Sequence, residues 1–218
     1  LSKFKRITPV GSLSSAARFY SIEGASIPVN PKYDVGIIGS VKIGSELGDD
    51  DLNILLYVKS YLKKNSNMKG CFISKYDPYT NEYNREKEFI SSLFEGNIEY
   101  KHRSKELDTL VIGAMCKVAI GTVTVMLREL YSMGVKVYCL NTSPQSHTLP
   151  FNKLGFLEFP TNNDFEKKLT SLIKMRRAKY FATVANDYID INTKGGLTAI
   201  DNIGLALSDI TARNRTES

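Results

Sequence analysis

Short apolar runs alternate with longer amphipathic segments through the middle of the chain. The runs are rich in Val, Ile and Cys and are bounded by Gly, Lys or Asn, which is typical of buried parallel strands. They predict strands over Tyr33–Ser40, Lys69–Lys75, Ile98–His102, Lys117–Gly121 and Val135–Asn141. Each strand is followed by a segment with helical spacing of its apolar positions, except the last.

The intervening segments have helix signals at both ends. The first begins with an acidic triplet and ends in two lysines, which suits the dipole of a helix, and the fourth stops at Gly134, a favourable residue just past a helix end. The predicted helices cover Gly48–Asn65, Asn84–Asn97, Ser104–Met115 and Val123–Met133. Strands that alternate with helices indicate βαβ units, so we predict an α/β fold with a Rossmann-like parallel sheet flanked by helices.

Two of these helices have a predicted inner face. On the first, the residues expected to face the core are Leu52, Leu55, Leu56 and Val58, together with Tyr61 or Leu62. On the second, they are Phe89, Ile90, Leu93 and Phe94. These side chains should cover one face of the sheet.

The pattern changes after Asn141. A Pro- and Gly-punctuated loop leads to a short strand near Phe156–Phe159, and extra C-terminal helices are predicted over 162–175, 176–196 and 197–214. We therefore divide the chain into a linker or N-terminal arm over 1–32, a Rossmann-like domain with C-terminal helices over 33–212, and a frayed tail over 213–218.

Charge narrows the choice of partner. The 218 residues carry 29 Lys and Arg against 23 Asp and Glu, a formal balance of +6. That excess suits a nucleotide, a phosphorylated glycan or an anionic membrane surface, and equally an ordinary solvated surface. No basic block with interleaved aromatic residues is present, so nucleic acid is not an expected partner.

Cysteines and apolar run lengths indicate the compartment. Cys71, Cys116 and Cys139 lie in apolar runs without a CxxC spacing, as expected of free buried thiols in a reducing, cytoplasmic setting. No leader peptide and no run long enough to span a bilayer is visible. The chain begins at Leu1 rather than Met, so we expect a preceding part of a longer protein.

Small, hydroxylic and basic residues follow the predicted strands. In open parallel sheets ligands bind at the carboxyl ends of strands, where such side chains and helix N-termini can hold a phosphate. The first-choice ligand residues are Ser40, Lys42, Gly121, Thr122 and Thr124, and the second-choice ones are Lys75, His102, Arg103 and Asn141. The alternatives are plain helix caps for the threonines and solvated or packed side chains for the others.

Glu129 is a carboxylate on a largely apolar helix. It follows Thr122 by seven residues, two helical turns, which predicts that it lies on the same face as the preceding turn. A carboxylate there can accept two hydrogen bonds from a ribose diol. The alternative is a charge partner for Arg128 or Lys136.

The stretch Cys116–Asn141 resembles the donor-binding motif of GT-B-type glycosyltransferases. In that superfamily the fourth strand of the C-terminal Rossmann domain ends in a Gly–Ser/Thr turn, and a helix with a ribose-binding Glu and then a Gly follow. The positions that match are Gly121, Thr122, Thr124, Glu129 and Gly134. Val123 departs from the pattern, because a second Ser or Gly often stands there.

Other segments extend the resemblance over nearly the whole chain. Residues 7–20 and 33–40 resemble the linker and first strand of the C-terminal half of surface-carbohydrate proteins, those of capsule and lipopolysaccharide biosynthesis. Residues 149–175 resemble the segment after the fifth strand in the same proteins. The resemblance implies a nucleotide-activated sugar as donor substrate, with CMP, UDP or CDP as the nucleotide, and no cofactor.

The resemblance also implies what this chain does not supply. In GT-B enzymes the catalytic base usually belongs to an N-terminal acceptor domain, so we name no catalytic residue and expect that domain to precede this chain. The acceptor would be a glycan or a lipid-linked glycan, at the inner face of the membrane if the protein associates peripherally. Such enzymes need no metal for this step, and we predict no metal site, with Gly48–Asp51 as a helix cap.

Four other functions are alternatives for such a fold. A sugar-nucleotide epimerase needs several carboxylates and a His along the cleft, and a polyol-phosphate transferase uses a similar turn. A non-catalytic α/β nucleotide-binding or response-regulator-like domain would need an Asp after the first strand, where Gly39 and Ser40 stand. A dehydrogenase would need GxGxxG there, which "GSVKIG" does not match.

Overall fold

The computed structural model describes part of the chain. It covers residues 30–39, 49–102, 109–122, 124–132, 134–141, 157–158, 161–183, 193–194 and 197–198. The predicted arm up to residue 29, the tail over 213–218 and the helix from 199 onward lie outside the described residues. Ser40, Lys42 and Arg103 lie outside them as well.

A parallel sheet forms the centre of the fold. Its strands are β1 (Tyr33–Ile38), β2 (Gly70–Ile73), β3 (Ile98–Lys101), β4 (Cys116–Gly121), β5 (Lys136–Asn141) and the two-residue β6 (Leu157–Glu158). They lie in the order β3-β2-β1-β4-β5-β6, and every neighbouring pair is parallel. The predicted Rossmann-like α/β class is confirmed.

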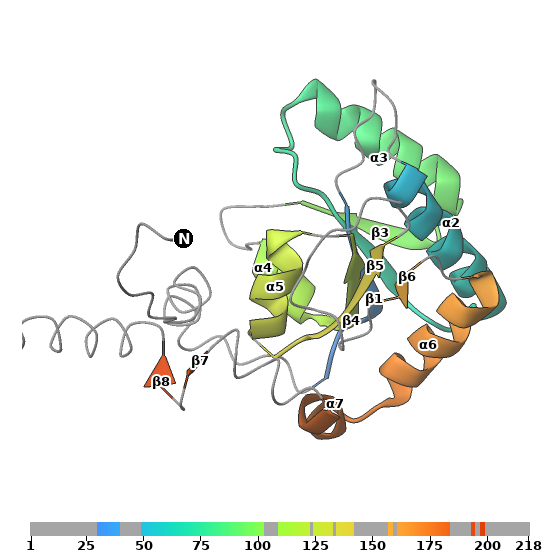
Figure 1. Ribbon diagram of the computed structural model, residues 1–218. Coiled ribbons are helices and arrows are strands. Elements are labelled where there is room, and N and C mark those ends of the chain that lie inside the picture. The colour runs from blue at the N-terminus through green and yellow to red at the C-terminus, as the bar shows by residue number, and fades with distance from the viewer. Residues whose placement is uncertain are drawn as a thin grey trace, which may run out of the picture.

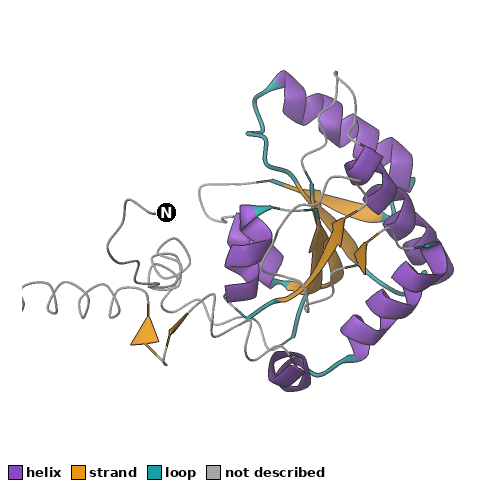
Figure 2. Ribbon diagram, viewed as in Figure 1, coloured by secondary structure: helices purple, strands orange, loops and turns teal. Residues whose placement is uncertain are grey.

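Helices cover both faces of this sheet (Figures 1 and 2). They are α2 (Asp49–Lys64), α3 (Asn81–Phe94), α4 (Thr109–Ala114), α5 (Val125–Ser132), α6 (Asn162–Lys174) and α7 (Arg177–Thr183). In Figure 1, α2, α3 and α6 lie to the right of the sheet and α4 and α5 to its left, with α7 below. The helices α2, α3, α4 and α5 each lead into the next strand of the parallel sheet, so their N-termini lie toward the carboxyl ends of the strands.

The C-terminal expectations need a correction. Residues 193–194 and 197–198 were expected to be helical, but they form β7 (Thr193–Lys194) and β8 (Leu197–Thr198), an antiparallel pair. The Gly195-Gly196 dipeptide between them is a turn signal that the helical spacing of the flanking apolar residues obscured.

The core lies on both sides of the central strands. On α2, the buried side chains are Ile54, Leu55, Val58, Tyr61 and Leu62. Leu56, predicted to face inward, is 45% exposed. It is one residue, or about 100° around the helix, past Leu55, so it leaves the stripe that Leu55, Val58 and Leu62 form.

The helix α3 buries a polar residue among its apolar ones. Ile90 and Phe94 are buried and Phe89 and Leu93 pack against the core, as predicted. Glu86 is also buried, with an exposed fraction of 0%.

Three buried thiols occupy the sheet, as predicted. The Sγ atoms of Cys71 and Cys116 are 3.6 Å apart. They meet across Gly36 of β1, where a Cβ atom would collide with the Cys116 sulfur. Two strand spacings of about 4.8 Å separate their backbones, beyond the usual span of a disulfide, so both residues stay thiols without a backbone shift.

The start of β5 holds the ends of α6 and α7. Lys136 is 7% exposed, and its ammonium donates to the main-chain oxygens of Leu172, of Ile173 at 3.3 Å and of Met175 at 2.8 Å. These are carbonyls that the end of α6 leaves without helical partners. Burial and, second, the nearby Lys117 lower the pKa of Lys136 to about 8, so the ammonium form prevails at neutral pH.

A tyrosine fixes α7 in the same place. The Tyr180 hydroxyl donates to the Val137 carbonyl at 3.1 Å and accepts from the Val137 N–H at 3.2 Å. Both backbone groups of one β5 residue are therefore satisfied by a side chain of α7.

Two further polar contacts lie at the starts of the strands. The Lys117 ammonium is 2.7 Å from Asp34 Oδ1. Glu99 Oε2 lies 2.7 Å from the Lys101 ammonium and accepts a hydrogen bond of 2.7 Å from Tyr33. Lys101 first, and then Tyr33, hold the pKa of Glu99 down at about 2.

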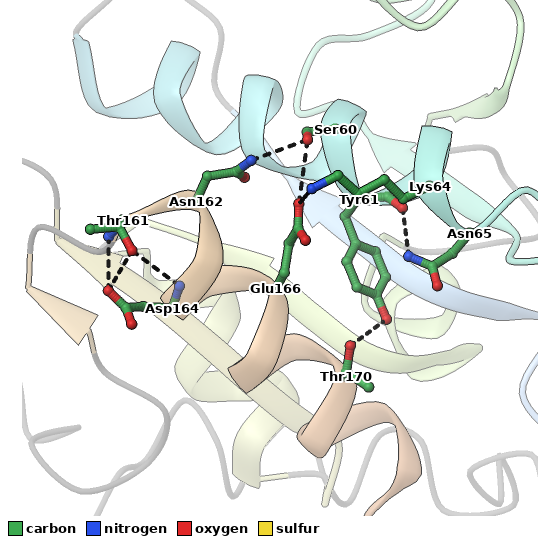
Figure 3. Close-up of polar contacts among 9 residues, drawn as sticks. All are labelled: Ser60, Tyr61, Lys64, Asn65, Thr161, Asn162, Asp164, Glu166 and Thr170. Carbon is green, nitrogen blue, oxygen red and sulfur yellow. Dashed lines mark hydrogen bonds and ion pairs between the residues drawn. The ribbon is translucent and has the colours of Figure 1, made fainter.

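The helices α2 and α6 contact each other through polar side chains (Figure 3). Glu166 lies 2.6 Å from the Lys64 ammonium, and the hydroxyls of Tyr61 and Thr170 are 3.2 Å apart. At the start of α6, Thr161 and Asp164 form a capping box. The N-terminal half of α6 therefore carries carboxylates, and its end is held by a lysine.

Candidate functional site

The order of the strands changes direction between β1 and β4, and we call the carboxyl ends of these two strands the β1–β4 crevice. The chain leaves β1 toward β2 on one side, and it leaves β4 toward β5 on the other, so this is the switch point at which α/β sheets bind ligands. Ile37 pairs with Ile120 in the parallel register. Gly39 and Thr122, two residues further along each strand, therefore lie at the mouth of the crevice.

Two glycines make this mouth narrow. A Cβ atom on Gly121 would lie 2.9 Å from the main-chain oxygen of Ile38 and 3.3 Å from a methyl carbon of Leu127. A Cβ atom on Gly39 would collide with the ring of Phe72. The backbones of β1 and β4 approach this closely because Gly121 lacks a side chain, whereas Gly39 leaves room for the Phe72 ring of β2.

Thr124 is the N-cap of α5. Its hydroxyl accepts a hydrogen bond of 3.2 Å from the Leu127 N–H. The cap reading is therefore correct for Thr124, which still has a hydroxyl hydrogen to donate. Thr122 lies two residues before the cap and is half-buried, at the end of β4.

The end of α5 has the predicted glycine. Gly134 has a φ of 85°, its N–H donates to Tyr131 O at 2.9 Å, and the Val135 N–H donates to Leu130 O at 2.9 Å. These two bonds are those of a Schellman motif, which a glycine favours. The strand–turn–helix–Gly–strand order expected of Cys116–Asn141 is thus confirmed.

Glu129 stands on α5 in a different register from the predicted one. The two-turn spacing from Thr122 assumed that the helix begins there, but α5 begins at Val125. Glu129 is consequently one turn above the helix start, roughly 6 Å along the axis. It is half-buried, while its neighbours Leu127 and Leu130 are buried against the sheet. A ribose role for Glu129 stays a prediction.

A second polar cluster lies at the ends of β2 and β3. The Tyr100 hydroxyl donates to Glu86 Oε2 at 2.6 Å, and burial, with the Glu86 contact second, raises the pKa of Tyr100. Tyr83 packs edge-on against both Tyr100 and His102. The Tyr83 hydroxyl is 3.3 Å from His102 Nδ1.

This cluster includes a residue that sequence reasoning missed. Glu86 lies on the inner stripe of α3 with Tyr83, Ile90 and Phe94, at helical spacings of three, four and four. A carboxylate inside an apolar stripe was the available signal. It went unused because only the apolar positions were assigned to the core.

The remaining candidates are spread along the sheet edge. The end of β3 is three strand spacings, roughly 14 Å, from the end of β4, so His102 is remote from Thr122. Lys75 is exposed after β2, and its ammonium is 5.1 Å from the centre of the Tyr76 ring. Asn141 ends β5 beside β4, and its side chain is not described.

The structure therefore brings together Gly39, Gly121, Thr122 and Thr124, with Glu129 above them. Lys75 and His102 could reach the same ligand only if it extended along the edge. Across the described ranges, no three His, Cys, Asp or Glu side chains gather as they would around a metal ion. No helix in the described part of the chain is long and apolar enough to cross a membrane.

Solved structures with the same fold are enzymes of sugar metabolism. The pneumococcal O-GlcNAc transferase GtfA, in complex with UDP and GlcNAc, matches 84% of this chain with a TM-score of 0.52 and 11% identity. Sucrose-phosphate synthase from Thermosynechococcus elongatus matches 97% with a TM-score of 0.52 and 9% identity. The UDP-GlcNAc 2-epimerase from Neisseria meningitidis, bound to UDP-GlcNAc, matches 92% with a TM-score of 0.51 and 10% identity.

These likenesses establish the fold, which is shared with GT-B glycosyltransferases. The matched regions span 36%, 52% and 51% of those three proteins, so the chain corresponds to about a third to a half of their length. No model of a protein family matches the sequence, and no curated protein matches it.

Proposed function

We propose that the chain is the donor-binding half of a glycosyltransferase that uses a nucleotide-activated sugar. The crevice between β1 and β4 carries the proposal: a Gly-Thr turn leads into the N-terminus of α5, and a carboxylate, Glu129, lies one turn above it. The UDP-bound transferase and the UDP-GlcNAc-bound epimerase of the same fold support a nucleotide sugar as the ligand.

The phosphate would bind at the turn. The first N–H groups of α5 have no partners within the helix apart from the one that Thr124 accepts, and the helix dipole adds positive potential there. The Thr122 hydroxyl can donate from the end of β4. As the sugar departs, negative charge grows on the phosphate oxygens, and these donors stabilise it without rearrangement.

The ribose would bind one turn further along α5. A carboxylate accepts from both hydroxyls of a diol, so Glu129 would position the nucleoside while the N-terminus holds the phosphate. Ser40 and Lys42, which follow β1 in the sequence, are the other residues proposed for the phosphate. Lys75, His102, Arg103 and Asn141 are assigned to the outer parts of the donor.

The acceptor and the base come from elsewhere in this proposal. An acceptor domain would bind a glycan or lipid-linked glycan of a surface polysaccharide, such as capsule or lipopolysaccharide, on the cytoplasmic side. That domain would supply the catalytic base, and the transfer would use no cofactor.

A calorimetric titration tests the nucleotide site. We expect binding of UDP, CDP or CMP, and we expect Glu129→Gln to weaken it at least roughly tenfold, because charged hydrogen bonds to two hydroxyls are lost. Glu88→Gln, on the exposed side of α3, is the matched control and should leave affinity unchanged. Absence of binding by all three nucleotides, or equal affinities of the two variants, would refute the site.

An epimerase of the same fold is the second candidate, favoured by the UDP-GlcNAc 2-epimerase likeness. Because the chain spans 51% of that epimerase, proton NMR with UDP-GlcNAc separates the two when the chain is incubated together with the domain that would complete it. A transferase leaves the donor unchanged without an acceptor, whereas an epimerase interconverts the C2 epimers. The described carboxylates near the crevice are few, which supports the transferase.

A further inference from the structure

Positive charge collects where α6 ends and α7 begins. The cationic side chains there are Lys174, Arg176, Arg177 and Lys179, and all four are exposed. We call this surface the basic end. No Asp or Glu occurs in the sequence between Glu166 and Asp187. The acidic residues of α6, Asp164 and Glu166, lie in its first half and are engaged in the capping box and with Lys64.

A helix C-terminus commonly attracts lysine, but here that role is already filled. The carbonyls at the end of α6 accept hydrogen bonds from the buried Lys136 ammonium. Arg177 lies against Gly134, so it packs on the end of α5. Within the described residues, no carboxylate forms an ion pair with Lys174, Arg176 or Lys179.

The basic end lies away from the β1–β4 crevice. Lys136 and Val137 begin β5, and they contact the end of α6 and Tyr180 of α7. The basic end is therefore at the amino-terminal edge of the sheet, while Gly121 and Thr122 follow the carboxyl end of β4. In Figure 1, α7 lies beside the end of α6 below the sheet.

We propose that the basic end docks the protein on an anionic phospholipid surface. Clusters of four to eight Lys and Arg on a helical segment bind anionic lipids, and this cluster falls in that range. Single-stranded nucleic acid is disfavoured, because such sites interleave aromatic side chains and Tyr180 is buried. Docking through this edge leaves the crevice pointing away from the membrane and open to soluble donor.

Vesicle co-sedimentation of the full chain tests the proposal. We expect binding to vesicles of equal parts phosphatidylcholine and phosphatidylglycerol at low salt, weak binding to phosphatidylcholine alone, and loss of binding as salt rises. Reversing two charges in Lys174→Glu/Arg176→Glu should weaken the anionic-vesicle binding by at least about tenfold. Circular dichroism and the urea midpoint of each variant show whether the variant remains folded.

The control has the same change of charge in another place. Arg85→Glu/Lys87→Glu alters two exposed cations on α3, and its vesicle affinity should stay within about twofold of the original. Failure of the original chain to bind anionic vesicles, equal losses in both double variants, or binding only to a single-stranded oligonucleotide would each overturn the proposal. Nucleotide titration on the same samples is independent, because neither pair lies at the crevice.

Discussion

The two edges of the sheet are built on opposite principles. At the amino-terminal edge, long side chains are tied down: Lys136 binds the end of α6, Tyr180 binds Val137, and Tyr33 binds Glu99. At the carboxyl edge between β1 and β4, the residues are Gly39, Gly121 and two threonines. At the amino-terminal edge, long side chains contact other parts of the protein. At the carboxyl edge, the residues between β1 and β4 are small and lie beside the N-terminus of α5.

That difference separates stability from binding. Donors already satisfied by the protein cannot serve a ligand, so a binding edge must forgo contacts that would stabilise the fold. Substitutions at the amino-terminal edge should therefore lower the free energy of unfolding strongly and leave nucleotide affinity unchanged. Substitutions at the carboxyl edge between β1 and β4 should lower the free energy of unfolding modestly and weaken nucleotide binding.

The largest expected effect belongs to Lys136. Lys136→Met leaves the carbonyls of Leu172, Ile173 and Met175 buried without this donor, which should cost about 3 kcal/mol of the free energy of unfolding. Urea denaturation measures it. Lys117→Met is the control, since the Lys117–Asp34 pair is 42% exposed on the lysine side and should cost about 1 kcal/mol or less. Equal costs would mean that Lys136 does not hold α6.

The next effect tests whether the narrow mouth matters. Gly121→Ala puts a Cβ atom 2.9 Å from the Ile38 oxygen, and the displaced backbone should cost about 2 kcal/mol and also weaken nucleotide binding. Gly96→Ala is the matched change at a φ of 79°, with no neighbour within 4 Å. It should cost about 1 kcal/mol and leave nucleotide affinity intact. If Gly121→Ala binds nucleotide with unchanged affinity, Gly121 is not part of the nucleotide site.

Thr124 and Thr122 should differ in function, Thr124 as the cap of α5 and Thr122 as a nucleotide ligand. Thr124→Ala removes the hydroxyl that caps α5 and should cost about 1 kcal/mol, whereas Thr124→Ser should restore most of it. Thr122→Ala should cost less stability and more nucleotide affinity. Urea midpoints and calorimetric titration on the same variants measure both quantities. A larger affinity loss for Thr124→Ser than for Thr122→Ala would reverse the assignment.

The smallest effect is a pH dependence at the amino-terminal edge. The folded-state pKa of Glu99, about 2, is below its ordinary value of 4.5, so its stabilisation is complete above 4.5 and is lost as pH falls toward 2. Glu99 is 48% exposed, which limits the contribution to less than about 1 kcal/mol. The stability difference between the original chain and Glu99→Gln should shrink over that range. A constant difference would show that Glu99 is not stabilised by its partners.

The sequence predicted the sheet because each strand is a short apolar run. Buried parallel strands need no tertiary information to be located, and Gly134 and Thr124 mark the ends of α5 by local chemistry alone. The sequence placed candidate ligand residues after every strand, and the strand order in the structure locates the switch point between β1 and β4.

What the sequence could not supply depends on side chains far apart along the chain. Lys136 reads as the polar first residue of a strand, and only the fold places it under the end of α6, 36 residues later. Glu86 gains its meaning from Tyr100 in the same way. The start of α5 was predicted at Val123 because Val123 and Thr124 fit a helix as readily as a turn. The helix begins at Val125, so Glu129 lies one turn above the helix start.

The three cysteines give the sheet its own kinetic reporters. Cys71, Cys116 and Cys139 lie on β2, β4 and β5. The hydrogen bond with Cys116 and, second, burial raise the thiol pKa of Cys71, and burial raises that of Cys139 to about 12. An alkylating reagent can reach them only when the strands open, so rates of modification, read by mass spectrometry, measure the opening of each part of the sheet. If nucleotide occupies the crevice, saturating nucleotide should slow the alkylation of Cys116 on β4. The experiment uses the native cysteines, so no cysteine has to be introduced by mutation.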